Sequence, residues 1–100
     1  MVKHIVMWKL HDFAEGMNKD ENALRMKQWL EELQSAIPEI QKLEVGINFN
    51  NADDAYDIVL YSEFKDKASL EIYQNHPAHI EFKNKIKDIR SDKKVVDYEI

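Results

Sequence analysis

The sequence predicts one α+β domain whose elements follow the order β-α-β-β-α-β. Apolar residues alternate at every second position in four segments and recur every three or four positions in the segments between them. Turn-forming residues and prolines separate these segments. At 100 residues the chain has room for one domain, which we expect to span residues 1–100.

The first predicted strand, Val2 to Leu10, has two apolar faces. One face carries every second residue from Val2, and the other places Ile5 and Met7 between two lysines. An antiparallel sheet with one wet side would carry polar residues along the whole of that side. Because a single copy leaves Ile5 and Met7 uncovered, we expect a homodimer formed through this open sheet face.

The first helix has recognisable start and stop signals. Asn18 and Glu21 have the spacing of a capping box, and Pro38 disfavours helical geometry at the residue before it. Between these signals runs an apolar stripe at helical spacing: Ala23, Met26, Leu30, Leu33 and Ile37.

A hairpin is predicted next. Apolar and polar residues alternate from Leu43 to Phe49, turn-forming residues occupy positions 50–54, and a third strand runs from about Ala55 to Phe64. The two strands flank a short turn, so we expect them to pair directly.

Two short helices and a last strand complete the order. Asp66 can cap a helix from Lys67 to about Asn75, and Pro77 suits the first turn of another helix. The chain then alternates from Lys94 to Ile100 as a strand. This is the order of the ferredoxin-like fold, in which the helices cover one face of a four-stranded antiparallel sheet.

Composition excludes several classes of function. The net charge of −5 argues against nucleic-acid binding, and the basic stretch from Lys83 to Lys94, interrupted by Asp88 and Asp92, is typical of a solvated helix face. No apolar run approaches a membrane span, and no secretory signal is visible. Without cysteines, and with only two glycines, neither thiol chemistry nor a phosphate loop is expected. We expect a soluble cytoplasmic protein without a cofactor.

Three segments resemble the stress-responsive A/B barrel (Dabb) family. They are Val2 to Val6, the Ile-Pro-Glu turn at 37–39 leading to Val45-Gly46, and Tyr73 to His79, whose His-Pro-Ala-His sequence is the most specific. The resemblance implies a dimeric α+β barrel in which two sheets face each other.

The similarity extends distantly to plant polyketide cyclases, olivetolic acid cyclase among them. In those enzymes a first-strand histidine, and a tyrosine and a histidine around the His-Pro-x-His segment, line the cavity. By motif position the resemblance implies that His4, Tyr73 and His79 are the corresponding residues here.

These three residues could carry proton transfer if they share one cavity. A neutral imidazole could take a proton from a carbon acid while the Tyr73 hydroxyl donates a hydrogen bond to a carbonyl oxygen. The competing interpretation is that His4, Tyr73 and His79 are hydrogen-bonded core residues, because a buried imidazole needs a partner whatever its role.

Other residues have plainer interpretations. His76 is expected to cap the helix that begins at Pro77, and His11 to lie in solvent. His76 and His79 have a spacing that can hold a metal, but the motif lacks carboxylate or thiolate ligands, so no metal site is expected. The following apolar residues are expected to form the wall of a pocket or the core: Val6, Trp8, Met26, Leu30 and Phe82.

Three functions follow, in order of preference. The first is a dimeric barrel that binds a small apolar or aromatic molecule without catalysis. The second is a cofactor-independent cyclase or isomerase that uses aldol or enolisation chemistry. The third, a cofactor-independent monooxygenase, rests on fold analogy alone.

Overall fold

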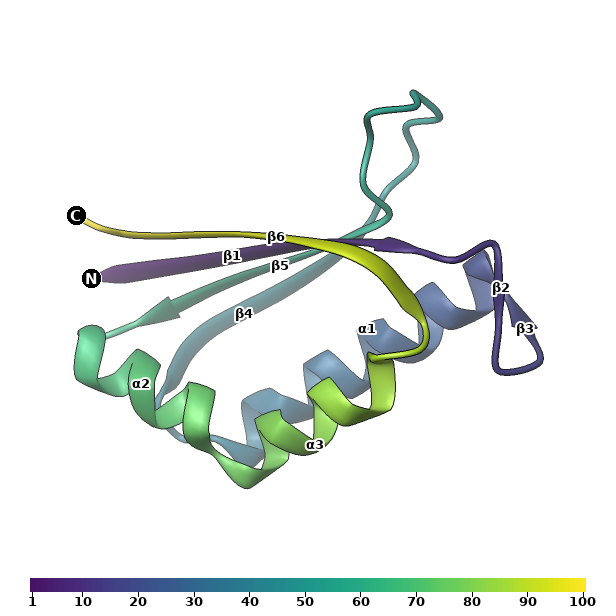
Figure 1. The fold of residues 1–100 in the computed structure, drawn as a ribbon. Helices are drawn as coiled ribbons and strands as arrows, with labels where there is room; N and C mark the ends of the chain where they lie inside the picture. Colours follow the sequence, from purple (N-terminus) through teal and green to yellow (C-terminus); the bar gives the residue numbers. More distant parts are fainter.

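Four antiparallel strands form a sheet in the order β4-β5-β1-β6, and three helices cover one of its faces (Figure 1). The computed structural model describes residues 1–100. Its main elements are β1 (Val2–Leu10), α1 (Lys19–Ala36), β4 (Ile40–Ile47), β5 (Ile58–Phe64), α2 (Lys67–Asn75), α3 (Pro77–Ile86) and β6 (Arg90–Glu99). The ferredoxin-like order predicted from the sequence is confirmed.

A short hairpin, β2 (Phe13–Ala14) and β3 (Met17–Asn18), occupies the segment predicted to be a loop. Its turn places Glu15 and Gly16 at φ of 53° and 76°. This left-handed region is easy for glycine because it has no Cβ.

The helix signals are confirmed. Asn18 and Glu21 form the reciprocal hydrogen bonds of a capping box at the start of α1. The Asp66 side chain accepts a hydrogen bond from Ser69 N at the start of α2, and Nδ1 of His76 accepts one from Ala78 N at 3.0 Å at the start of α3. Because His76 and Pro77 separate α2 from α3, the chain bends between them.

Strand limits differ from the predicted ones where tertiary pairing decides them. β4 begins at Ile40 and ends before Phe49, whose side chain is 95% exposed. β5 begins at Ile58, after Asp57 has bonded to the end of β1. β6 begins at Arg90, which pairs with Leu10, rather than at Lys94.

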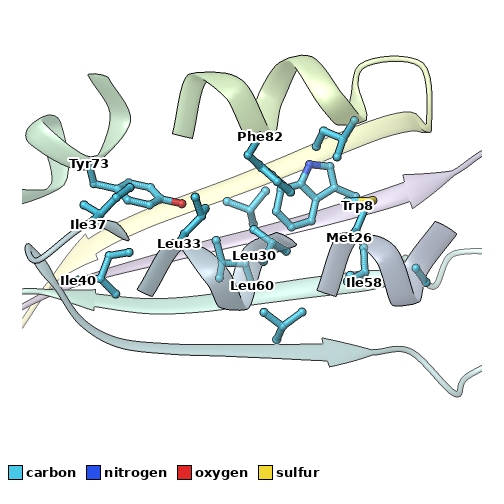
Figure 2. Packing of buried hydrophobic residues seen from close by; sticks show 14 of the residues in the cluster. Trp8, Met26, Leu30, Leu33, Ile37, Ile40, Ile58, Leu60, Tyr73 and Phe82 are labelled. Carbon is cyan, nitrogen blue, oxygen red and sulfur yellow. The ribbon is translucent and has the colours of Figure 1, made fainter. Parts of the chain in front are cut away.

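The core lies between the helices and the inner face of the sheet (Figure 2). Every second residue of β1, from Val2 to Leu10, is buried there. The fully buried side chains include Met26, Leu30 and Ile37 of the α1 segment. No helix combines the length and the apolar character needed to cross a lipid bilayer.

The outer face of the sheet carries no helix (Figure 1). At its centre Ile5 lies opposite Tyr61 of β5 and Val96 of β6. Met7 and Val96 are 37% and 55% exposed. An apolar face of this kind is unusual for a sheet surface in contact with water.

Candidate functional site

A cavity of about 510 Å³ opens between the inner face of the sheet and helices α2 and α3. His4, Tyr73 and His79 all line it. The sequence placed these three residues on three separate elements, and the fold brings them to one space. Its remaining wall consists of Val6, Trp8, Leu60, Gln74, Asn75, Phe82, Lys83, Asn84, Ile86, Lys87, Arg90, Lys93 and Val95.

The Tyr73 ring lies between the two imidazoles. Its centroid is 5.8 Å from that of His4 in an edge-on arrangement, and 4.5 Å from that of His79. Phe64 packs behind, 5.0 Å from Tyr73. These aromatic contacts hold the tyrosine ring in place between the two histidines.

His79 is held in one tautomer by the backbone. Its Nδ1 lies 3.1 Å from the carbonyl oxygen of Gln74, which can only accept, so Nδ1 carries the proton and donates. Burial, together with the charges of Lys83 and other neighbouring groups, lowers the pKa of His79 to about 4. At neutral pH the imidazole is therefore uncharged, and Nε2 holds its free lone pair.

His4 is oriented by a carboxylate. It is only 4% exposed, and its Nδ1 bonds to Oδ1 of Asp97 across the β1–β6 pair. The pairing assigns the proton to Nδ1 and leaves Nε2 on the opposite edge of the ring. Asp97 is the partner that a buried imidazole needs, and the sequence did not single it out.

Tyr73 is suited to donate rather than to ionise. Burial raises the pKa of its hydroxyl, so the group stays protonated at neutral pH. Figure 2 shows the ring extending from α2 into the interior with the hydroxyl at its far end. Its hydroxyl makes no hydrogen bond to the protein, so this donor is free for a ligand.

The expected wall residues divide into two groups. Val6, Trp8 and Phe82 line the cavity. Met26 and Leu30 do not, because they lie on the inner side of α1 and are completely buried in the core. A periodic apolar stripe marks a buried face, but it does not distinguish a cavity wall from closed packing.

The indole of Trp8 is a second donor in this cavity without a partner. Trp8 is 4% exposed and lines the cavity, and its buried indole Nε1 makes no hydrogen bond. Most buried donors are paired, so an orphan beside a cavity is a candidate for contact with a ligand.

The basic residues of the cavity were also missed as site residues. Lys83, Lys87, Arg90 and Lys93 belong to the stretch interpreted from sequence as a solvated helix face, yet all four line the cavity. Helical spacing places Lys83 and Lys87 on one side of α3 and its extension. That signal was visible, but only the fold shows what this side faces.

Several solved structures are similar to this chain. A dimeric protein of unknown function with a ferredoxin-like fold from Bacteroides fragilis is 34% identical, with a TM-score of 0.86 over 99% of this chain and 95% of that one. Two other similar structures are 18% identical. They are a hydroxynitrile lyase from Passiflora edulis (TM-score 0.77; 99% and 92% covered) and a protein assigned as an antibiotic biosynthesis monooxygenase from Nitrosomonas europaea (TM-score 0.76; 100% and 98% covered).

At 18% identity such likeness concerns the fold alone. No curated protein matches the sequence. The comparison with protein families is informative for the sequence itself. Residues 2–100, nearly the whole chain, match the family described as Stress responsive A/B Barrel Domain (Dabb). The chain therefore belongs to the stress-responsive A/B barrel domain family.

Proposed function

We propose that this protein binds a small apolar or aromatic carbonyl compound in the cavity and transfers a proton on it. The observation that carries the proposal is the placement of Tyr73 between His4 and His79 in one cavity wall. The groups needed for enolisation are then all side chains, and the chemistry requires no cofactor.

In the proposed reaction His79 is the base. Its Nε2 takes a proton from the carbon beside the carbonyl group, and the electrons of the broken C–H bond form a C=C bond. The carbonyl π electrons move to oxygen, where the Tyr73 hydroxyl donates a hydrogen bond to the enolate. Where the enolate is conjugated with a further C=C bond, the imidazolium can return its proton to the far carbon of that system in an isomerisation. In an aldol cyclisation the enolate carbon attacks a second carbonyl carbon, and the imidazolium gives its proton to the alkoxide that forms.

His4 supports this arrangement from the other side of Tyr73. Its ring is fixed by Asp97, and its edge-on contact fixes the tyrosine ring. We assign His4 a role in positioning Tyr73, and Asp97 a role in positioning His4.

Deuterium exchange tests this function without knowledge of the natural substrate. Acetophenone in deuterated buffer is mixed with the protein, and loss of the methyl proton signal is followed by NMR. We expect wild-type protein to accelerate exchange over buffer, and His79→Gln to reduce the acceleration about 100-fold or more, as for loss of a general base. The matched control is His11→Gln, which changes an exposed histidine outside the cavity.

Two results would contradict the proposal. One is exchange at the buffer rate with wild-type protein for acetophenone, 1-indanone and 2-tetralone alike. The other is full activity in His79→Gln.

Binding without catalysis is the second candidate. It is favoured by the deep burial of His4 and Tyr73, which are 4% and 1% exposed and pack as core residues do. Saturable binding of an aromatic ketone without any accelerated exchange would select this function. The monooxygenase hypothesis has support from fold likeness alone, and no residue of the cavity argues for it.

We also propose that two copies associate through the outer face of the sheet. The exposed apolar residues around Ile5, Met7 and Val96 support this arrangement. Similar structures from Bacteroides fragilis and Thermobifida fusca are described as dimeric. The cavity lies on the opposite face of the sheet, so the pair would keep one cavity in each copy.

A further inference from the structure

The mouth of the cavity is strongly cationic although the chain is acidic overall. Lys83, Lys87, Arg90 and Lys93 all line the cavity, and no aspartate or glutamate does. Arg90 is half-buried and the three lysines are exposed, so the charged groups lie on the solvent side of the cavity. The net charge of the whole chain is −5. Acidic residues outnumber basic ones in the chain, so an average patch of its surface would carry more carboxylates than cations. The cavity differs from such a patch because its charged residues are all cationic.

None of the four cations is neutralised by an ion pair. The ion pairs of the protein involve other cations. One of these is Lys85 of α3, whose Nζ lies 3.6 Å from Oε1 of Glu81. The two acids inside the basic stretch face elsewhere, since Asp92 accepts a hydrogen bond from Tyr56 and Asp88 is exposed outside the cavity.

Three of these cations act on one another electrostatically. Burial and the charges of Lys83 and Arg90 lower the pKa of Lys93. The charge of Asp97, whose carboxylate is hydrogen-bonded to His4, opposes this effect and offsets part of the repulsion. Four cations beside a single carboxylate still repel one another, and an anion placed among them would relieve the repulsion.

The inner part of the cavity has a different character. Val6, Trp8, Leu60 and Phe82 form an apolar and aromatic wall, with the unpartnered indole Nε1 of Trp8 among them. A ligand that fits both parts has an apolar body and an anionic head.

We propose that the cavity selects an aromatic or apolar organic oxyanion, with its charged group held by Lys83, Lys87, Arg90 and Lys93 at the mouth. The inference rests on the proposed function, because it names the class of ligand for the same cavity. The ligand's body then packs against the wall that Trp8 and Phe82 form, where a carbonyl group can reach Tyr73 and His79.

Three probes share a naphthalene ring and differ in the group attached to it, so they test whether the cavity prefers an anionic group. They are 2-naphthoate, 2-naphthyl phosphate and the neutral 2-naphthamide. Binding is followed by the indole N–H signals in an NMR titration. We expect the Trp8 signal to shift, and that of Trp29, which does not line the cavity, to stay in place. We expect the better of the two anions to bind about tenfold or more tightly than the amide, and its affinity to fall as salt is raised.

Charge-removing variants locate the interaction. Lys83→Gln and Arg90→Gln should each weaken anion binding about threefold, because these pairs are partly solvated, and the double variant about tenfold. Lys85→Gln removes the same charge from the same helix but outside the cavity, so it should leave the affinity unchanged. Amide binding should be unaffected in all of these variants.

Each outcome bears on one of the two proposals. If the amide binds as tightly as both anions, or if Lys85→Gln weakens binding as much as the double variant, the anion inference is overturned while aromatic binding stands. If none of the three probes binds at millimolar concentration, the anion inference and the aromatic cavity proposal both fail.

Discussion

The rings of Tyr73 and His79 lie 4.5 Å apart although the residues belong to different helices. In one unbroken α-helix, residues six positions apart would point about 120° away from each other. The bend at His76 and Pro77 removes this separation and turns both side chains to the same cavity. The His-Pro-Ala-His segment therefore contributes its backbone geometry as well as its imidazoles.

Tyr73→Phe should separate packing from catalysis. The change keeps the buried ring and removes only the hydroxyl, which has no partner in the protein, so the free energy of unfolding should change by less than about 1 kcal/mol. Exchange of acetophenone should slow about tenfold to 100-fold because the developing oxyanion loses a donor. Urea unfolding and the NMR exchange assay measure the two effects. Unchanged exchange in a stably folded Tyr73→Phe protein would remove Tyr73 from the proposed mechanism.

Asp97→Asn should loosen His4 rather than remove a reacting group. The asparagine amide cannot match a carboxylate as acceptor for Nδ1–H, and the Asp97 side chain is 38% exposed, so a stability loss of only about 1 kcal/mol is expected. The indicative readout is the His4 imidazole ¹⁵N spectrum, which should change from one tautomer to a mixture. Glu99→Gln is the matched control on the same strand. A single unchanged tautomer in Asp97→Asn would contradict the positioning role.

The pH dependence of stability follows from His79. Its pKa is lowered to about 4 in the folded protein, against 6.5 for an ordinary histidine, mainly because burial disfavours the charged ring. Between these values the unfolded chain binds more protons than the folded chain, so the contribution of His79 to stability is lost as pH falls from about 6.5 towards 4. Urea unfolding at pH 7 and pH 5 should therefore show a smaller acid destabilisation in His79→Gln than in wild type. An equal pH effect in both proteins would show that His79 is not held neutral.

The lowered pKa of His79 also predicts how the rate of the proposed reaction depends on pH. Because His79 must be unprotonated to act as base, exchange corrected for the buffer rate should be constant from about pH 6 to pH 8 and decline only below about pH 5. A midpoint near 6.5 would indicate a solvated histidine as the base instead.

Local signals in the sequence were sufficient for the four strands of the main sheet and for the three helices, but the β2–β3 hairpin was not predicted. Caps such as Asn18 with Glu21 depend on residues a few positions apart, and the two apolar faces of β1 depend on alternation alone. The resemblance to the family added Tyr73 through its motif.

Long-range relationships were not predictable in the same way. Asp97 meets His4 through the register of β1 with β6, across 93 positions of sequence. Likewise Lys83 and Arg90 could be placed on a polar side, but not at a cavity mouth, until α3 and β6 were packed against the sheet. Strand register and helix packing depend on contacts throughout the fold, so they cannot be predicted from the periodicity of one segment.

The outer face of the sheet yields the last prediction. Met7→Lys and Val96→Lys each place an ammonium group on the apolar face proposed to join two copies. Burying that charge without a partner is costly, so the dimer dissociation constant should rise at least about tenfold. Sedimentation at micromolar concentration measures it, and Leu24→Lys, at a 62% exposed position of α1, is the control. Since both positions are already exposed in one copy, the variants should keep their circular dichroism spectrum. A wild-type protein that sediments as a monomer, or variants that associate as wild type does, would show that this face is not the interface.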